Sequence, residues 1–579
     1  MATRTGKLHA ITIDRNIPVV MRDGTRLMAD VYRPKGPGRY PVILERTPYD
    51  KTQSSETRFG AGEFFASHGY AAVFQDVRGR FASEGDFYPF RDDGWGVNRD
   101  GYDTIEWCAA QPWSDGKVGT IGGSYSGATQ YRMLPTRPPH LVCSFVRQSS
   151  SDYHNEWVYR SGAFELEFNL SWAVRNTATH AARLAGPGRA AVVKAVIEKA
   201  AEEVSSWTSH LPLDPLPPLE GLYSWYRDWL AHPHDGPYWH QFNIALKHHE
   251  VDTPVYHLGS WFDGFLRGTL ENFAGMRRLA KSEAARQSQR LIVGPWVHGP
   301  GSIETSKVGE VDFGAAAIIK FNEYRLPWFD YWLKGARNGA MDTPSVRLFT
   351  TGANRWREAD GWPPSGITYT PFYLRGGKSG AAKSLNDGCL SMAPPEGAEH
   401  PESYAYDPLD PVATLGGGYL GSKNGPYDQR PVEGKVLTYT SEPMPKELEV
   451  TGPVRAVLYA LSSAKDTDWV VRITDVWPDG TSMLVCDGVL RARYRTSREN
   501  PQLLDGGIVR YEVDLWGASH AFKRGHRIRV AVTSSCFPRW DRNMNTGGDN
   551  SREVRGIVAI NTVFHDSARP SHVILPVAR

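Results

Sequence analysis

The sequence contains little cysteine for its 579 residues. The five cysteines lie far apart along the chain, and none forms a C-x-x-C pair: Cys108, Cys143, Cys389, Cys486 and Cys536. A small, odd and scattered set excludes a disulfide-built scaffold and argues against a structural zinc site. Such cysteine usage is typical of a reducing compartment, so we expect a cytoplasmic protein.

Long apolar runs and an excess of one charge are also lacking. No stretch of about 18 apolar residues occurs, which predicts that no helix spans a membrane. Residues 1–9 lack the apolar core of a signal peptide. Lys plus Arg number 66 and Asp plus Glu number 64, without a basic stripe. This balance argues against a nucleic-acid partner and against a membrane-surface partner.

The sequence has no H-E-x-x-H motif, so a metallohydrolase is unsupported, and we expect no metal and no other cofactor.

The chain contains an ordered change of secondary-structure pattern along its length. Apolar strand patterns alternate with helical patterns over residues 1–147 and again over 246–350. This alternation predicts an α/β fold with a doubly wound, largely parallel sheet.

The segments between and after these two regions differ in composition. Residues 148–245 show no clear strand, contain a helical pattern at 188–207 and are rich in aromatic residues. They are predicted to form a helical insertion above the carboxyl edge of the sheet, where such folds bind ligands. Residues 351–579 consist of short alternating runs separated by Gly, Pro, Asp and Asn, which predicts an all-β domain, a sandwich or a jelly roll.

Ser124 lies between a strand pattern and a helix pattern in Lys117–Gly127. Small residues surround it, with Gly122 two positions before it and Ser126 two positions after it. A serine on a sharp strand-to-helix turn is the nucleophile elbow of a serine hydrolase, because small neighbours let strand and helix approach closely. The match to G-x-S-x-G is imperfect, since Ser126 stands at the second glycine position, and a plain glycine-rich loop is the alternative.

Two later strand ends carry the residue types that a serine nucleophile requires. Asp263 and His298 each follow a predicted strand, in the chain order that doubly wound hydrolases use. In such sites a histidine takes the proton of the serine, and the acid orients the histidine. We therefore expect Ser124, Asp263 and His298 to form a catalytic triad, whereas His248 and His249 are expected at a solvated helix end.

The tetrahedral intermediate of ester hydrolysis needs hydrogen-bond donors for its oxyanion. The backbone N–H of Tyr125, the residue after the nucleophile, is the first expected donor. The second donor usually comes from the loop after an early strand, and here that loop contains Tyr49 rather than a glycine-rich segment. The Tyr49 hydroxyl is a candidate donor; the alternative is that Tyr49 only packs beside a turn.

Several motifs occur together along the chain. They are Arg46–Lys51, Gln75–Gly79, Gly122–Gly127, Trp261–Phe265 and Gly294–His298, followed in the β region by Asp466–Asp468, Asp475–Gly480, Gly525–Arg527 and Asp541–Asn543. With these motifs the chain resembles the bacterial cocaine esterase family, which also includes α-amino ester hydrolases and Xaa-Pro dipeptidyl-peptidases. The resemblance implies an α/β-hydrolase domain, an inserted helical cap and a C-terminal jelly roll. It also implies that Ser124 is the nucleophile, His298 the base and Asp263 the acid. Tyr49 and Tyr125 would form the oxyanion hole.

The resemblance further implies an acyl pocket. The family positions that enclose an aromatic acyl group are held by Trp157, Trp172 and Phe265. Three positions depart from the family. Leu420 is followed by a glycine where the family has a phenylalanine. Ser126 replaces a leucine, and Arg175 replaces a leucine of the cap. We therefore expect a roomier, more polar pocket in which Arg175 favours acyl groups bearing a carboxylate. The alternative places Arg175 at the protein surface.

Together these features predict a serine esterase that cleaves carboxylic esters through an acyl-enzyme, with a small-molecule ester or amide as its partner. A homo-oligomer is left open. The first alternative is an Xaa-Pro dipeptidyl-peptidase or an acylase on the same scaffold, although no acidic pair is marked for the amino terminus of a substrate. The second is a carbohydrate-binding jelly-roll protein without catalysis, against which the intact set of Ser, Asp and His argues.

Overall fold

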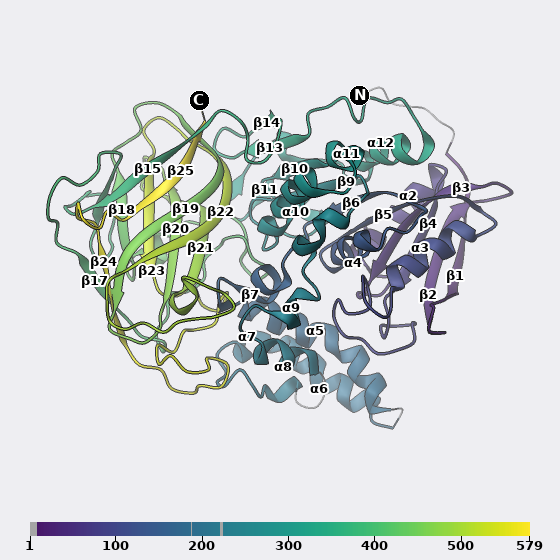
Figure 1. Cartoon of the computed structure of the whole chain (residues 1–579), viewed down its shortest axis with the longest axis horizontal. Coiled ribbons are helices and arrows are strands. Elements are labelled where there is room, and N and C mark those ends of the chain that lie inside the picture. Colours follow the sequence, from purple (N-terminus) through teal and green to yellow (C-terminus); the bar gives the residue numbers. More distant parts are fainter. Residues whose placement is uncertain (1–7, 187, 220–223, 579) are drawn as a thin grey trace.

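The computed structural model describes residues 8–186, 188–219 and 224–578. Figure 1 shows an α/β region in purple to teal, a helical region in blue, and an all-β region in green to yellow. The helical region lies beside both of the others, below them in this view. Within these described residues, no helix is both long and apolar enough to cross a bilayer.

The α/β region is built on one ten-stranded sheet. In spatial order its strands are β1 (Ile11–Val20), β2 (Arg26–Pro34), β4 (Ala71–Asp76), β3 (Tyr40–Thr47), β5 (Ser114–Gly123), β6 (Leu141–Arg147), β9 (Val255–Ser260), β10 (Arg290–Gly294), β13 (Val346–Thr350) and β14 (Arg355–Ala359). The central strands from β4 to β13 pair in parallel, and the pairs at the two edges are antiparallel. This arrangement confirms the predicted α/β fold.

Helices cover both faces of this sheet, because alternate strand residues point to opposite sides. The helices are α1 (Ser55–Arg58), α2 (Ala61–Ser67), α3 (Asp100–Ala110), α4 (Tyr125–Met133), α10 (Leu266–Leu279), α11 (Glu283–Gln287) and α12 (Phe321–Lys334). On one face Ile43 packs with Phe65 of α2 and Phe329 of α12. Its neighbour Leu44 packs on the other face with Ile105 of α3. The sheet is therefore doubly wound, as predicted.

The sheet extends past residue 350, where the C-terminal domain was expected to begin. Strand β14 pairs antiparallel with β13, from Val346 opposite Ala359 to Thr350 opposite Arg355. Two antiparallel neighbours need only a short connection between them. Because β14 belongs to the same sheet as β13, the α/β region continues through the β13–β14 hairpin.

The inserted region between β6 and β9 is mainly helical. It contains a π-turn (Tyr153–Val158), a short hairpin of β7 (Tyr159–Arg160) and β8 (Ala163–Phe164), and the helices α5 (Leu166–Ala185), α6 (Ala190–Glu202), α7 (Val204–Trp207), α8 (Ser224–Ala231) and α9 (Pro237–His240). Helices α6 and α7 fall within the helical pattern predicted at 188–207. We refer to residues 148–245 as the cap.

The C-terminal region forms an eleven-stranded sheet system. Its strands are β15 (Ile367–Arg375), β16 (Gly388–Ser391), β17 (Glu402–Tyr406), β18 (Leu437–Ser441), β19 (Leu448–Ser462), β20 (Asp468–Val476), β21 (Ser482–Arg491), β22 (Val509–Phe522), β23 (Arg527–Thr533), β24 (Ala559–Phe564) and β25 (His572–Ala578). Apart from short turns such as α13 (Arg430–Glu433), the described part of this region contains no α-helix. Buried residues of these strands form a core of their own, which confirms the predicted all-β domain.

Candidate active site

Ser124 sits on a sharp turn between β5 and α4, with φ 58° and ψ −125°. A non-glycine residue rarely adopts a positive φ, so this conformation stores strain of the kind that occurs at functional sites. A Cβ placed on Gly122 would lie 2.6 Å from the Cβ of Ser126, so strand and helix approach too closely for a larger residue at 122. The local geometry is that of a nucleophile elbow, with Ser126 small enough to fill the second glycine position.

Ser126 faces the interior beneath this elbow. Its side chain is 2% exposed and lies near the carboxyl of Glu45. This carboxyl is fully buried and accepts a hydrogen bond from Ser54 Oγ at 2.6 Å. Burial, and then the charge of nearby Glu56, raise the pKa of Glu45 to about 8. That Ser126 makes the acyl pocket roomier therefore stays a prediction.

Asp263 and His298 follow β9 and β10, neighbouring parallel strands whose carboxyl ends share one edge of the sheet. His298 Nδ1 lies 2.9 Å from Asp263 Oδ1, with the histidine side chain 17% exposed and the aspartate side chain fully buried. A carboxylate can only accept, so the proton is assigned to Nδ1 and the lone pair to Nε2. No hydrogen bond between the Ser124 hydroxyl and His298 Nε2 is present among the described residues; such catalytic bonds are often long before substrate binds.

The ring of His298 packs against Phe265, which connects it to the aromatic residues of the cap. Its edge meets the ring of Phe265, with the centroids 5.4 Å apart. Phe265 in turn stacks on Trp157 at 4.6 Å with an interplanar angle of 18°. The imidazole is thus held by an acid at one nitrogen and by aromatic rings at its side, which limits its rotation.

Tyr49 lies beside the elbow. Its phenol oxygen accepts a hydrogen bond from Trp172 Nε1 at 3.1 Å. Burial raises the pKa of Tyr49, while the hydrogen bond from Trp172 and the nearby Ser124 side chain and Tyr125 backbone act in the opposite direction. The phenol therefore sits next to both the nucleophile and the backbone N–H that begins α4, where an oxyanion would form. This position favours the predicted oxyanion role over simple packing beside a turn.

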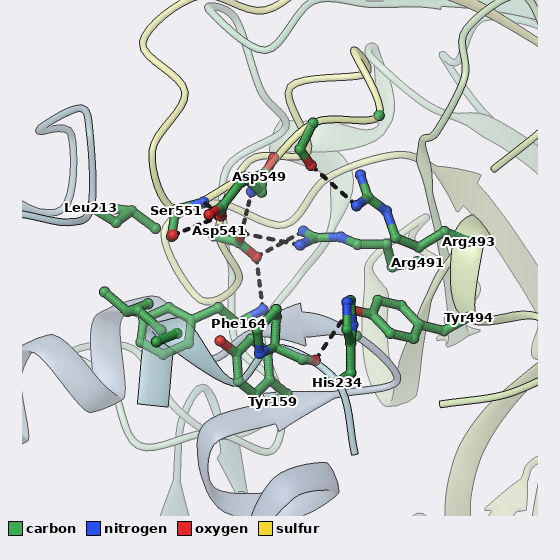
Figure 2. Close-up of a pocket in the computed structure, with 17 residues that line it drawn as sticks. Tyr159, Phe164, Leu213, His234, Arg491, Arg493, Tyr494, Asp541, Asp549 and Ser551 are labelled. Carbon is green, nitrogen blue, oxygen red and sulfur yellow. Dashed lines mark hydrogen bonds and ion pairs between the residues drawn. The ribbon is translucent and has the colours of Figure 1, made fainter. Parts of the chain in front are cut away.

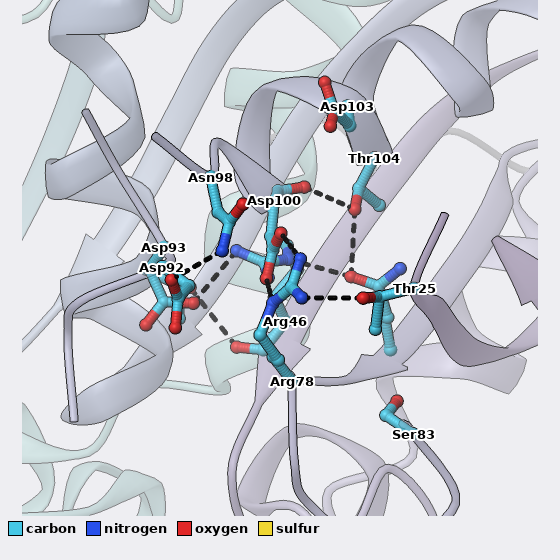
Figure 3. Close-up of polar contacts among 12 residues, drawn as sticks. Thr25, Arg46, Arg78, Ser83, Asp92, Asp93, Asn98, Asp100, Asp103 and Thr104 are labelled. Atoms are coloured by element: carbon cyan, nitrogen blue, oxygen red, sulfur yellow. Dashed lines mark hydrogen bonds and ion pairs between the residues drawn. The ribbon is translucent and has the colours of Figure 1, made fainter. Parts of the chain in front are cut away.

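Tyr125 is anchored by its own phenol at the back of the site. The phenol donates to Asp93 Oδ2 at 3.0 Å and accepts from the backbone N–H of Phe90 at 2.7 Å. Arg46 Nη1 in turn lies 3.1 Å from the other oxygen of Asp93, and Figure 3 shows this pair within a wider network of arginines and aspartates. Burial and the nearby Asp93 charge hold the pKa of Tyr125 well above its usual value. The side chain is thus fixed, and with it the start of α4.

The aromatic residues expected around the acyl group do come together. Trp157, Trp172 and Phe265 belong to one buried apolar cluster with Tyr125, and Leu420 packs against it. The rings of Tyr125 and Trp172 are nearly parallel, with an interplanar angle of 8° and centroids 6.2 Å apart.

Arg175 is not part of this cluster. It lies three residues after Trp172 on α5, and its side chain is exposed. A guanidinium keeps its charge and is most stable in water, so the surface alternative fits this position. The structure gives no support to the expectation that Arg175 faces the acyl pocket.

A loop of the C-terminal domain closes one side of the site. A Cβ on Gly418 would lie 3.2 Å from the carbonyl oxygen of Asp263, and one on Gly264 would lie 2.4 Å from Leu420 Cδ1. The buried Arg539 donates from Nη2 to the Gly418 carbonyl at 2.9 Å and so fixes this loop. The β domain therefore packs against the main chain of Asp263 and Gly264, at the loop of the acid candidate.

A separate cavity of about 500 Å³ lies between the cap and the C-terminal domain. Figure 2 shows the labelled residues of its lining, with Arg491 bound to Asp541 and with Asp541 accepting from the backbone N–H of Phe164 at 2.7 Å. Arg491 is also paired with Asp468. None of the residues that line this cavity belongs to the candidate triad or acyl pocket. Its polar wall includes groups that tie the cap to the β domain, such as Asp541 with Phe164 and Tyr494 with His234.

Two buried polar residues next to the elbow were not predicted. Asp93 lies in a polar loop that gave no signal beyond its charge. Gln148 directly follows β6 and therefore stands at the same carboxyl edge as Asp263 and His298. A polar residue immediately after a central strand was the one signal that could have indicated it.

Comparison with known proteins places this geometry in a family. The chain is 37% identical over 584 residues to the cocaine esterase of Rhodococcus sp. (strain MB1 Bresler), with 98% of this chain and 99% of the relative covered. The chain belongs to the cocaine esterase family. Residues 23–300 also match the X-Pro dipeptidyl-peptidase (S15 family) model, and residues 338–574 match the C-terminal non-catalytic domain of X-Pro dipeptidyl-peptidases.

Solved structures similar to this member of the cocaine esterase family extend over the whole chain. An aminopeptidase from the marine sediment archaeon Thaumarchaeota archaeon superposes with a TM-score of 0.81 at 26% identity, covering 100% of this chain and 98% of its own. An α-amino acid ester hydrolase superposes with a TM-score of 0.79 at 26% identity, with the same coverage. Membership of the cocaine esterase family confirms the predicted serine ester hydrolase with an α/β-hydrolase domain and a C-terminal all-β domain.

Proposed function

We propose that this chain hydrolyses carboxylic esters with apolar or aromatic acyl groups through an acyl-enzyme on Ser124. One observation carries the proposal: the bonded pair of Asp263 and His298 lies at the same sheet edge as the strained elbow of Ser124. The aromatic cluster of Trp157 and Phe265 beside His298 supports an apolar acyl group.

In the proposed reaction His298 Nε2 takes the proton of the Ser124 hydroxyl while Oγ attacks the ester carbonyl carbon. The carbonyl π-electrons move to its oxygen, and this oxyanion is bound by the Tyr49 hydroxyl and the Tyr125 backbone N–H. When the oxyanion collapses, the ester C–O bond breaks and the alcohol leaves with the proton from His298. Water then attacks the acyl-enzyme with His298 as base, and the acid departs as Ser124 regains its proton.

Labelling by a fluorophosphonate tests this mechanism. We expect one label per chain on Ser124, a burst of p-nitrophenol from p-nitrophenyl butyrate, and a loss of kcat of roughly 10⁴-fold or more in Ser124→Ala. Ser149→Ala is a matched control, because Ser149 lies beside the elbow and its hydroxyl donates to the Ser124 carbonyl at 2.9 Å. Full activity in Ser124→Ala, or labelling at another residue, would reject the mechanism.

A dipeptidyl-peptidase is the second candidate, because residues 23–300 match the X-Pro dipeptidyl-peptidase model. The residues after Asp263 are Gly264, Phe265 and Leu266, which offer no acidic group for the ammonium of a peptide. We therefore expect p-nitrophenyl butyrate to be cleaved with a kcat/KM far above that for Gly-Pro-p-nitroanilide. The reverse preference would establish the peptidase, and glycan binding without a burst would favour the non-catalytic alternative.

We further propose three properties that rest on the sequence predictions: a jelly-roll arrangement of the β domain, function in a reducing compartment such as the cytoplasm, and self-association. Five free cysteines, of which Cys389 and Cys486 are partly exposed, support the reducing compartment. Subcellular fractionation tests the location, and analytical ultracentrifugation tests the oligomeric state.

A further inference from the structure

Gln148 lies between the elbow and the loop that carries His298. It is fully buried and has a φ of 48°, a left-handed conformation that is uncommon for a residue other than glycine. Its backbone oxygen accepts from the Ser124 N–H at 3.1 Å, and its own N–H donates to the Leu258 carbonyl at 2.7 Å. The main chain of Gln148 is thus attached to the nucleophile residue and to β9.

The side chain of Gln148 reaches the peptide groups on both sides of His298. Nε2 donates to the Val297 carbonyl at 2.7 Å, and Oε1 accepts from the Gly299 N–H at 2.8 Å. One amide therefore pairs with the residue before and the residue after the histidine. The amide orientation follows from these partners, because a flipped group would place oxygen against oxygen and N–H against N–H.

The remaining bonding positions of this amide are also used. The second proton on Nε2 is donated to Ser260 Oγ at 2.6 Å, and Oε1 accepts from Arg147 Nη1 at 2.8 Å. A primary amide has two donor protons and two acceptor lone pairs, so every one of them has a partner. A fully paired buried amide has a single orientation and resists displacement.

We propose that Gln148 is a positioning residue that sets His298 against Ser124, given the esterase mechanism proposed above. Asp263 fixes the tilt of the imidazole through Nδ1, whereas Gln148 fixes the backbone from which the ring projects. Because Gln148 also bonds to the Ser124 N–H, it ties base and nucleophile to one group. A displacement of about 1 Å in such an arrangement can cost about a hundredfold in rate.

Ser302 provides a comparison within the same loop. Its hydroxyl interacts with the Val297 carbonyl at 2.8 Å and with the Gly299 carbonyl at 3.0 Å. Ser302→Ala therefore removes contacts to the same two flanking residues but leaves the connection to the elbow intact. If the connection between the His298 loop and the elbow matters, and not the rigidity of the loop alone, the Gln148 variants will lose more activity than Ser302→Ala.

The experiment measures the burst-phase acylation rate with p-nitrophenyl butyrate, per Ser124 titrated by fluorophosphonate. Wild type, Gln148→Ala, Gln148→Asn and Ser302→Ala are compared. Asparagine tolerates positive φ and keeps the amide, but it is too short to pair with both flanking residues. We expect acylation to fall about 10- to 100-fold in both Gln148 variants and by less than about threefold in Ser302→Ala.

A role in stability alone would lower the melting temperature and the titratable fraction while leaving the acylation rate per site unchanged. Rates per site within about threefold of wild type in whichever Gln148 variant folds would therefore overturn the proposal, as would an equal loss in Ser302→Ala. A wild-type protein with no burst and no label would instead overturn the esterase mechanism itself, and the role of Gln148 with it.

Discussion

The indole nitrogen of Trp172 donates a hydrogen bond to the phenol oxygen of Tyr49 over 3.1 Å. An indole N–H can only donate, so the phenol accepts here and keeps its own proton for another acceptor. The proposed acceptor is the oxyanion of the tetrahedral intermediate. Trp172, expected to enclose the acyl group, therefore also orients the hydroxyl that we propose for the oxyanion hole.

Trp172→Phe removes this donor and keeps an aromatic ring. We expect kcat to fall about 2- to 12-fold, which corresponds to the net value of one neutral hydrogen bond. Trp157→Phe is the matched control, because the buried Nε1 of Trp157 has no hydrogen-bond partner within the described residues. Steady-state kinetics should show a change in KM rather than kcat for the control; equal losses of kcat would assign the effect to packing.

Tyr49→Phe removes the proposed side-chain donor of the oxyanion hole. We expect kcat to fall about 10²- to 10³-fold with little change in KM, because the bond forms only as the oxyanion develops. Tyr88→Phe serves as a control, since its phenol bonds to Asp228 at 2.9 Å in the cap. A Tyr49→Phe enzyme with wild-type kcat would show that backbone donors suffice.

Tyr125→Phe separates structure from catalysis. The change leaves a buried oxygen of Asp93 and the Phe90 N–H without their partner, so we expect a loss of about 1–3 kcal/mol in the free energy of unfolding. The backbone N–H of Tyr125 remains in this variant. We therefore expect kcat to stay within about threefold of the wild-type value, a smaller change than the loss of one neutral hydrogen bond can cause. Urea unfolding checks the first expectation. Tyr153→Phe, whose buried hydroxyl has no partner in the described chain, should leave the unfolding midpoint nearly unchanged.

Glu45 makes stability depend on pH. Burial raises its pKa from 4.5 to about 8, so between these values the folded state holds a proton that the unfolded state has released. The unfolded state therefore gains stability as pH rises, and the free energy of unfolding falls from about pH 4.5 to about pH 8.

Glu45→Gln removes this titration and keeps the shape of the neutral acid. We expect a shallower decline of stability over that range than in the wild type, by at most about 1.4 kcal/mol per pH unit. Chemical unfolding at several pH values measures the difference. Glu198→Gln on α6, with its side chain 56% exposed, should reproduce the wild-type profile. Parallel profiles for Glu45→Gln and the wild type would contradict the assignment.

Arg175→Ala tests the surface position of that residue. Because its guanidinium is exposed, we expect the ratio of kcat/KM for neutral and carboxylated acyl esters to change by less than about twofold, as for an exposed charge remote from the reaction. A fall of about tenfold or more in activity toward the carboxylated esters alone would instead show that Arg175 acts in the acyl pocket.

The sequence was most informative where local pattern and chain order coincide. Apolar runs with turns at their ends predicted the central strands. The order Ser124, Asp263, His298 predicted that one site lies at the carboxyl ends of these strands. The helix α5 was not identified, because its aromatic residues are common in strands and its helical state is stabilised by packing in the cap.

Contacts between distant residues could not be predicted. Gln148 bonds to Val297 and Gly299 about 150 positions away, and nothing near it in the chain indicates those partners. His248 was expected in solvent, but it is 2% exposed and its Nε2 lies 2.9 Å from Asn272 Oδ1. Such positions are decided by tertiary packing rather than by local propensity.

The close approach of Gly418 to the Asp263 backbone joins the C-terminal domain to the loop of the proposed catalytic acid. Gly418 and Leu420 belong to a domain that begins after the last triad candidate. Gly418 nevertheless lies against the Asp263 backbone, and Leu420 packs against the aromatic cluster of the proposed acyl pocket. A chimera that exchanged this domain between two relatives would therefore bring foreign residues against the recipient's proposed acyl pocket. A shortened enzyme ending at β14 would in turn lack both the packing of Leu420 on this cluster and the cover of Gly418 over the Asp263 backbone.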